Sequence, residues 1–343
     1  MPPVNLKNLS RAEIEAFFER LGEPRFRADQ VFRWIFGRGQ RDFSGMTNLA
    51  KTLRERLRSE ACIAGLTVAE VERAPDGAAK LALDAGDGAR VESVLIPDDE
   101  SDRLTLCLST QVGCGMGCAF CRTAQLGLER NLTSGEIVDQ LLLAREEAGE
   151  RRISNLVLMG MGEPLQNLEQ VIKAVQILLD DTGPNFSGRR ITVSTSGIVP
   201  RLKALGEAVP VKLAVSLNAT TDAVRDQIMP INRKYPLATL LEACREYPRA
   251  RRDRITFEYV LLGGVNDSDD DADRLVRLLH DVPAKINLIA FNEYEGCRFR
   301  RPDDERVQRF RERLVGRKLT AIVRASRGSL ISAACGQLAG RRP

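Results

Sequence analysis

The sequence is short of several residue types, and each shortage narrows the possible classes of protein. Its single histidine, His280, lies in a leucine-rich helical pattern and is more typical of a surface residue than of a metal ligand. Eight cysteines are too few for a disulfide scaffold in 343 residues. No apolar run reaches the roughly 20 residues that a membrane span needs, and the first residues lack the apolar core of a signal peptide. We therefore expect a cytoplasmic protein with no membrane segment, whose clustered cysteines serve metal or redox chemistry.

Charge of one sign is not in large excess, but it is unevenly distributed. The formal net charge is +4 and hydrophobic residues make up 43%, as in a folded globular chain. Lys and Arg outnumber Asp and Glu in residues 1–60 and 301–343, whereas the segment between them is acidic. Basic ends favour contact with phosphate groups, although ordinary solvated side chains produce the same pattern.

The first hundred residues divide into a helical part and a strand pair. A capping box at Ser10 and Glu13 opens the first helical pattern, and Trp34 in the second is expected in the core. Two apolar runs around a Gly/Asp turn at 85–88 predict a β-hairpin. We expect a helical accessory domain over 1–75 and a β-hairpin extension over 76–100.

From residue 101 onwards, strand and helix patterns alternate. Such repeated units indicate an α/β fold with a parallel sheet, here a partial (β/α)6 barrel over 101–343 with a C-terminal cysteine tail. Active residues of such folds gather where strands end. The expected strands are Leu104–Leu108, Asn155–Met159, Arg190–Ser194, Lys212–Leu217, Ile255–Leu262, Ile286–Phe291 and Leu319–Val323.

Three cysteines follow the first barrel strand closely: Cys114, Cys118 and Cys121. Three thiolates without an obvious fourth ligand suggest an iron–sulfur cluster with one open coordination position. A structural zinc site with a distant fourth ligand, or three unligated cysteines, remain alternatives. The C-x3-C-x2-C spacing, with Phe120 before the last cysteine, resembles the radical S-adenosylmethionine (SAM) superfamily. That resemblance implies a [4Fe-4S] cluster held by these three cysteines, with SAM bound to the fourth iron.

Polar and glycine residues end the other strands, where they are expected to bind SAM. Gly162 lets the backbone approach a ligand, and we expect Glu163 to accept a hydrogen bond from the SAM ammonium group. Taken singly, each match is an ordinary strand-to-loop turn, but several on one rim predict a site. The remaining candidates are Ser194, Ser216, Leu217, Asn218 and Asn292.

Two further cysteines narrow the interpretation. Cys107 lies on the first barrel strand and Cys335 near the C-terminus; taken alone, they are a buried strand cysteine and a tail thiol. With their surroundings, they resemble the RlmN family of dual-specificity RNA methyltransferases over nearly the whole chain. The matching segments are 26–31, 109–114, 123–125, 160–165, 194–197, 230–232, 285–289 and 334–338.

This resemblance implies formation of 2-methyladenosine in 23S rRNA and tRNA. Cys335 would be methylated by one SAM, a radical from a second SAM would activate the methyl group, and Cys107 would release the product through a transient disulfide. Glu92 matches the family's acidic base, an assignment that rests mainly on the resemblance; the alternative is a solvent-facing residue of the hairpin. The family often has Asp-Ile-Asp before Ala-Ala-Cys, whereas this chain has Leu330-Ile331-Ser332.

The resemblance also implies partners. An electron donor such as a flavodoxin or ferredoxin would supply electrons, and we expect a monomer. RNA phosphates would meet basic residues of the accessory domain and the Arg-rich tail. The accessory-domain candidates are Arg25, Arg27, Arg33, Arg38, Arg41 and Lys51.

Three other functions are compatible with parts of the pattern. A resistance-type enzyme that methylates C8 of the same rRNA adenine shares the cluster and both cysteines, but the accessory-domain match and the tail favour C2. A radical SAM enzyme for a peptide or metabolite would not need both Cys107 and Cys335. An RNA-binding protein with a structural metal site would bind zinc and no SAM.

Overall fold

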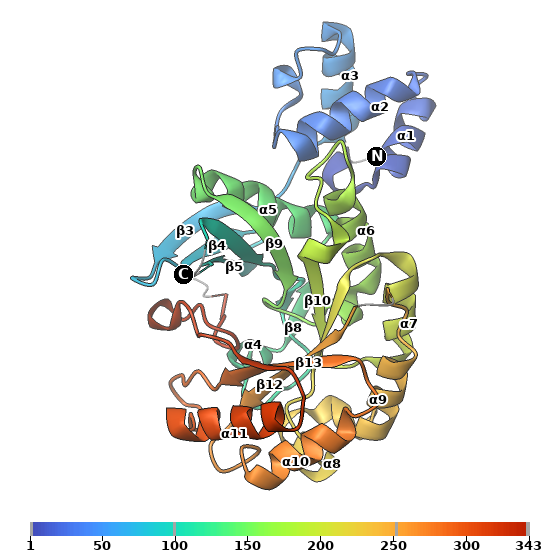
Figure 1. The fold of residues 1–343 in the computed structure, drawn as a ribbon. Helices are drawn as coiled ribbons and strands as arrows, with labels where there is room; N and C mark the ends of the chain where they lie inside the picture. Colours follow the sequence, from blue (N-terminus) through green and yellow to red (C-terminus); the bar gives the residue numbers. More distant parts are fainter. Residues whose placement is uncertain (1–2, 99–100, 251–252, 341–343) are drawn as a thin grey trace.

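A computed structural model describes residues 3–98, 101–250 and 253–340. In Figure 1 the N-terminal helices stand at one end of the molecule, above a curved sheet that is flanked by helices. Within the described residues, no helix is both long and apolar enough to cross a membrane.

The N-terminal helices form a small module around aromatic side chains. The helix α1 (Arg11–Arg20) begins at the capping box that the sequence predicts, with both reciprocal bonds between Ser10 and Glu13. The helix α2 (Arg25–Phe32) continues into a π-helical turn, and α3 (Lys51–Glu60) follows. The shared core of these elements includes the fully buried Phe18, Phe32, Phe36 and Leu57.

Trp34 lies at the edge of this module, so the expectation of a core tryptophan was wrong. Its ring is partly buried and packs against the core from outside. The indole Nε1 donates to Asn48 Oδ1 at 2.6 Å, and the Arg38 guanidinium lies 4.2 Å from the ring centroid. A tryptophan keeps its N–H satisfied most easily at such a half-exposed position.

The central sheet has ten strands in the order β14-β13-β12-β11-β10-β9-β6-β5-β4-β3. Its parallel part confirms the predicted strands: β6 (Arg103–Cys107), β9 (Arg152–Leu158), β10 (Ile191–Thr195), β11 (Lys212–Ser216), β12 (Ile255–Leu261), β13 (Ala284–Ala290) and β14 (Ala321–Val323). Its antiparallel part is β3 (Thr67–Arg73), β4 (Ala79–Asp84) and β5 (Arg90–Pro97).

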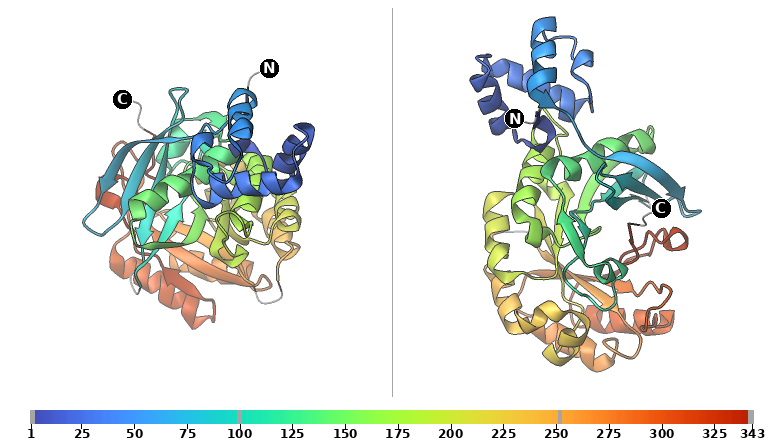
Figure 2. Two further views of the ribbon diagram at one scale, coloured as in Figure 1. Left: turned by 90° about the horizontal axis from the view of Figure 1, so that it is seen from above. Right: turned by 180° about the vertical axis from the view of Figure 1, so that it is seen from behind.

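Helices cover the outer side of the parallel strands, while β3–β5 and the C-terminal tail lie at the opposite side (Figure 1, Figure 2). The sheet is thus an open barrel whose strand ends face the tail. The helices after the first strand are α4 (Arg122–Gln125), α5 (Ser134–Ala148), α6 (Leu168–Leu179), α7 (Val199–Ala208), α8 (Asp222–Ile228), α9 (Leu237–Arg245), α10 (Asp269–Leu278) and α11 (Asp304–Gly316).

The antiparallel strands are continuous with the barrel sheet. Strand β5 pairs with β6, which places Val94 opposite Cys107. The sequence predicts β4 and β5 but not β3, which falls inside the segment we expected to be helical. The residues of β3 are mostly exposed, so they lack the alternation of apolar and polar residues that reveals a half-buried strand.

A buried ion pair ties the N-terminal segment to the barrel. Lys7 Nζ contacts the Asp139 carboxylate of α5, and both side chains are almost completely buried. The other carboxylate oxygen accepts from the Leu66 amide at 2.9 Å. Burial lowers the pKa of Lys7 and raises that of Asp139, and each charge opposes the shift of the other.

We expect Asp139→Leu to lower the free energy of unfolding by about 3–5 kcal/mol, because Lys7 is left as an uncompensated buried charge. The double variant Lys7→Met/Asp139→Leu removes that charge and should recover most of the loss. Urea denaturation measures both. A double variant no more stable than Asp139→Leu would contradict this explanation.

Candidate active site

A loop between β6 and α4 carries the three clustered cysteines. Its base is a two-stranded sheet that the sequence did not predict, formed by β7 (Gln111–Gly113) and β8 (Leu128–Asn131). The Cys114 amide donates to the Gly127 carbonyl at 2.8 Å, and the Ala119 amide donates to the Ile228 carbonyl at 2.9 Å. These bonds anchor the loop at both ends over the barrel rim.

All three cysteines line one cavity of about 160 Å³. Residues from the ends of the parallel strands complete its wall, as expected for this fold. Six of the seven sequence candidates for cofactor binding are among them: Gly162, Glu163, Ser194, Ser216, Asn218 and Asn292.

The arrangement of the thiols fits a multi-iron cluster better than a single metal ion. Among the residues that the structure describes, no group of three or more His, Cys, Asp or Glu side chains could hold one metal ion. A [4Fe-4S] cluster does not need such convergence, because each thiolate binds its own iron. Burial raises the pKa of Cys114 to about 12, so binding to iron must displace the thiol proton. The residues present thus fit a cluster.

The Glu163 carboxylate is already fully hydrogen-bonded within the protein. Its Oε1 accepts from Thr195 Oγ1 at 2.7 Å and from the Leu165 amide at 3.0 Å. Its Oε2 accepts from the Ser196 amide at 2.6 Å and from Ser196 Oγ at 2.8 Å. A carboxylate has about four acceptor sites, and in this arrangement Thr195, Leu165 and Ser196 fill them. Glu163 thereby joins the loop after β9 to the end of β10, and its bond to the SAM ammonium group stays a prediction.

Gly162 cannot carry a side chain at its position. Its φ is +103°, and an added Cβ would lie 2.6 Å from Gln111 Cβ. Gly86 offers a matched comparison, because its φ is +79° and nothing lies within 4 Å of an added Cβ.

We expect Gly162→Ala to lower the free energy of unfolding by roughly 2–4 kcal/mol, since it combines backbone strain with a clash. Gly86→Ala carries strain alone and should cost about 1 kcal/mol. Urea denaturation separates the two effects. Equal losses in both variants would show that the close approach to Gln111 does not matter.

Leu217 is the one candidate that does not line this cavity, and its contact with the cofactor stays a prediction. Its side chain is fully buried. Its backbone is also occupied: the amide donates to the Glu258 carbonyl at 3.0 Å, and the carbonyl accepts from Arg225 Nε at 2.9 Å.

Arg225 is a fully buried arginine that the sequence analysis missed. Its Nη2 donates to the carbonyls of Ser196 at 2.9 Å and Ser216 at 3.0 Å, which joins the ends of β10 and β11. Burial lowers its pKa to about 10. The sequence pointed to this region only through segment 230–232, which resembles the RlmN family. The Asn232 side-chain oxygen of that segment accepts from Arg225 Nη1 at 3.1 Å.

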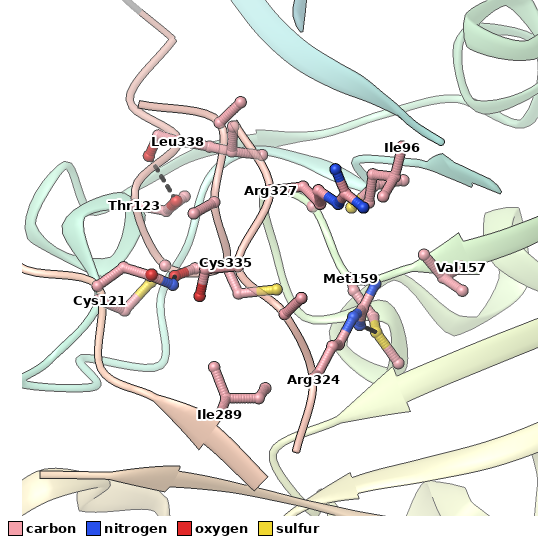
Figure 3. Close-up of a pocket in the computed structure, with 18 residues that line it drawn as sticks. Ile96, Cys121, Thr123, Val157, Met159, Ile289, Arg324, Arg327, Cys335 and Leu338 are labelled. Atoms are coloured by element: carbon pink, nitrogen blue, oxygen red, sulfur yellow. Dashed lines mark hydrogen bonds between the residues drawn. The ribbon is translucent and has the colours of Figure 1, made fainter. Parts of the chain in front are cut away.

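Cys335 lies where two cavities meet. It lines the cavity of the clustered cysteines and also a second one of about 90 Å³, which Cys107 lines as well. Both thiols are free. In Figure 3 the Cys335 sulfur points into the space between Cys121, Ile289 and Arg324.

Hydrogen bonds from several elements hold the tail around Cys335. Asn292 Nδ2 donates to the Cys335 carbonyl at 3.4 Å, and the Arg122 amide donates to the Gly336 carbonyl at 2.8 Å. Thr123 Oγ1 donates to the Leu338 carbonyl at 2.6 Å. The tail therefore forms a wall of the site. Leu330, which stands where the family often has an acidic residue, is 81% exposed.

Cys107 and Arg324 share the second cavity. Burial raises the pKa of Cys107 to about 12, and the Arg324 guanidinium opposes this shift. Arg324 follows β14 and was not identified from the sequence, because one arginine in an Arg-rich segment carries no signal of its own.

Glu92 is buried, which rules out the solvent-facing alternative. The carboxylate accepts from the Ala339 amide at 2.8 Å and lies 3.8 Å from Lys80 Nζ. It does not line either cysteine cavity. It is nevertheless on the same face of β5 as Ile96, which lines the Cys107 cavity, since alternate residues of a strand share a face.

The basic candidates of the accessory domain lie on its surface. Arg25, Arg33, Arg38, Arg41 and Lys51 are exposed, and Arg27 is half-buried beneath the exposed Phe26. In the C-terminal tail, Arg341 and Arg342 lie outside the described residues.

The barrel and its cysteine loop define a radical SAM methyltransferase, and comparison with known proteins agrees. Residues 108–276 match the radical SAM superfamily. The fold superposes with a TM-score of 0.93 on a radical SAM methyltransferase from Sphaerobacter thermophilus, which is 45% identical over 99% of this chain and 100% of the other. The cofactors of this class are a [4Fe-4S] cluster and SAM.

The family follows from the whole chain. Residues 4–63 match the ribosomal RNA large subunit methyltransferase N-terminal domain. The dual-specificity RNA methyltransferase RlmN of Geobacter sulfurreducens is 55% identical over 98% of this chain and 92% of its own length. The dual-specificity RNA methyltransferase RlmN of Geotalea uraniireducens is 52% identical over 99% of this chain and 98% of its own length. The chain belongs to the RlmN family.

Proposed function

We propose that this chain methylates C2 of an adenine in 23S rRNA and tRNA, through a methyl group carried on Cys335. Relatives that match the whole chain bear the name of dual-specificity RNA methyltransferases. The observation that carries the proposal is that Cys335 lines both the cluster cavity and the cavity of Cys107. A thiol placed there can take up a methyl group on one side and meet a second thiol on the other.

Cys114, Cys118 and Cys121 would hold the cluster, and the polar ends of the strands would hold SAM. When bound, these groups supply the methyl group for Cys335 and the radical that removes one hydrogen atom from it. The protein keeps Cys335 between cofactor and RNA through Asn292 and the other bonds of the tail. The target adenine must leave its stack to reach this site, because C2 is covered within a helix.

Cys107 and Glu92 would complete the reaction. The Cys335 methylene carbon would bond to C2, and the adduct would give its C2 proton to Glu92 and one electron back to the oxidised cluster that Cys114, Cys118 and Cys121 would hold. Cys107 sulfur then attacks Cys335 sulfur, and the bond between that sulfur and the methylene carbon breaks. The electron pair stays on the carbon, which takes a proton and becomes the methyl group, while the two sulfurs form a disulfide. An external reductant restores both thiols.

Glu92 would act after the tail shifts, since the Ala339 amide holds its carboxylate in the present arrangement. We further propose that the module within residues 1–75 contacts RNA through its exposed arginines. A small acidic redox protein, such as a flavodoxin or ferredoxin, would supply the electrons.

The test is mass spectrometry of nucleosides from RNA incubated anaerobically with cluster-loaded protein, reductant and methyl-labelled SAM. Labelled 2-methyladenosine supports the proposal. Labelled 8-methyladenosine would instead assign the C8 activity. SAM cleavage without any labelled adenosine would mean that the substrate is not RNA adenine.

A further inference from the structure

A third cavity, larger than the two that the cysteines line, lies at the opposite end of the barrel. Its volume is about 500 Å³, and it is walled by the starts of β6 and β9, the end of α5 and the loop before β10. We call it the arginine cavity, after its five arginines: Arg103, Arg145, Arg151, Arg152 and Arg190. None of the described residues that line it is an aspartate or glutamate.

Few carboxylates of the protein pair with the positive charges of these arginines. Arg145 is half-buried, and its Nη2 donates to the Pro184 carbonyl at 3.3 Å. Burial lowers its pKa, and no carboxylate opposes that shift. Arg190 donates to the Asn155 side-chain oxygen at 3.2 Å, whereas Arg151 pairs with the exposed Asp102 at 2.8 Å. A half-buried guanidinium without a carboxylate is costly unless an anion joins it.

The position of the cavity distinguishes between possible partners. Strand β9 runs seven residues from this end to the cluster rim, about 20 Å at ~3.3 Å per residue. An electron donor has to approach the cluster, so this end does not suit it. By contrast, the loop before β10 also holds Asp180, which lies 3.4 Å from Arg11 of α1. The cavity therefore borders the N-terminal module.

We propose that the arginine cavity binds phosphodiester groups of the substrate RNA, away from the target adenine. Guanidinium groups are the side chains best suited to phosphate, because they form paired hydrogen bonds with its oxygens. Together with the N-terminal module, the cavity extends the RNA contact along one side of the barrel. This inference rests on the proposed function, because it takes RNA as the substrate.

The test compares RNA binding by cluster-loaded wild type and variants. Fluorescence anisotropy measures the Kd for a tRNA transcript as a function of salt. The test variants are Arg151→Gln/Arg152→Gln and Arg145→Met. The control is Arg309→Gln on α11 combined with Arg317→Gln directly after that helix. It removes the same charge at the opposite end of the molecule from the N-terminal helices (Figure 1). Melting temperatures verify that each variant folds.

We expect the double test variant to weaken binding at least about tenfold near physiological salt. Its slope of log K against log salt should fall by about 1.5, since each lost phosphate contact lowers it by about 0.7–0.9. Arg145→Met should weaken binding in the same direction, and the control should match the wild type. Unchanged slopes, or an equal change in the control, would overturn the inference.

Two further readouts separate the remaining outcomes. If pyrophosphate raises the melting temperature of the wild type but not of the test variants, and RNA binding is unchanged, the cavity takes a small anion and the inference fails. Nucleoside analysis of the wild type reports on the proposed function independently. Methylation with unchanged salt slopes would refute only the cavity, whereas altered slopes without methylation would refute only the proposed function.

Discussion

Cys335→Ala is expected to abolish methylation of RNA while the protein still binds its cluster and cleaves SAM. Among the described cysteines, Cys335 and Cys121 line both cavities, and Cys121 is assigned to the cluster. Without it the methyl group has no carrier. Product formation should fall at least about 10³-fold, as for loss of other covalent nucleophiles.

Cys62→Ala is the matched control, because Cys62 is also a free thiol but lies on β2 (Ala61–Cys62) in the N-terminal module. It should methylate RNA at the wild-type rate. The measurements are label incorporation into RNA and, in the same samples, release of the deoxyadenosine product of SAM cleavage. Methylation by Cys335→Ala above one tenth of the wild-type rate would refute the carrier role.

Cys107→Ala has the second large expected effect, which is a trapped covalent complex. Its Cys335 can still become attached to adenine, but no second thiol is present to break the link between sulfur and carbon. On a denaturing gel, the covalent complex should run as a band of higher mass than the free protein. Nuclease digestion of the attached RNA should lower the mass of that band. Cys107→Ala/Cys335→Ala should give no such species. Normal turnover by Cys107→Ala would contradict the release step.

The release step should also depend on pH. Burial raises the pKa of Cys107 to about 12, so its thiol is mostly protonated at neutral pH, and only the thiolate attacks. The single-turnover release rate of the wild type should therefore rise between about pH 7 and 9. A flat profile would mean that another group removes the thiol proton before the attack.

The barrel and its cysteines could be predicted because local patterns carry them. Buried parallel strands appear in the sequence as nearly continuous apolar runs. The spacing of Cys114, Cys118 and Cys121 is a local signature of the radical SAM superfamily. Strands β3, β7 and β8 lack such a pattern, since they are short or exposed. Their pairing is decided by neighbours far away in the sequence.

The roles of polar residues were harder to predict than their positions. Glu163 reached the cavity wall as expected, but its carboxylate is saturated by Thr195, Leu165 and Ser196. Sequence cannot reveal how many partners a buried carboxylate has, because those partners come from other strands. For the same reason Arg225 went unnoticed.

The most direct test of the account follows the methyl group itself. Protein is loaded with trideuteromethyl on Cys335, freed of SAM, and allowed one turnover with unlabelled SAM, reductant and RNA. The account predicts that the first methyl group on adenine keeps two deuterium atoms, since it comes from Cys335 after loss of one. A first product that carries no deuterium would show that the methyl group reaches RNA without passing through Cys335, and would contradict the account.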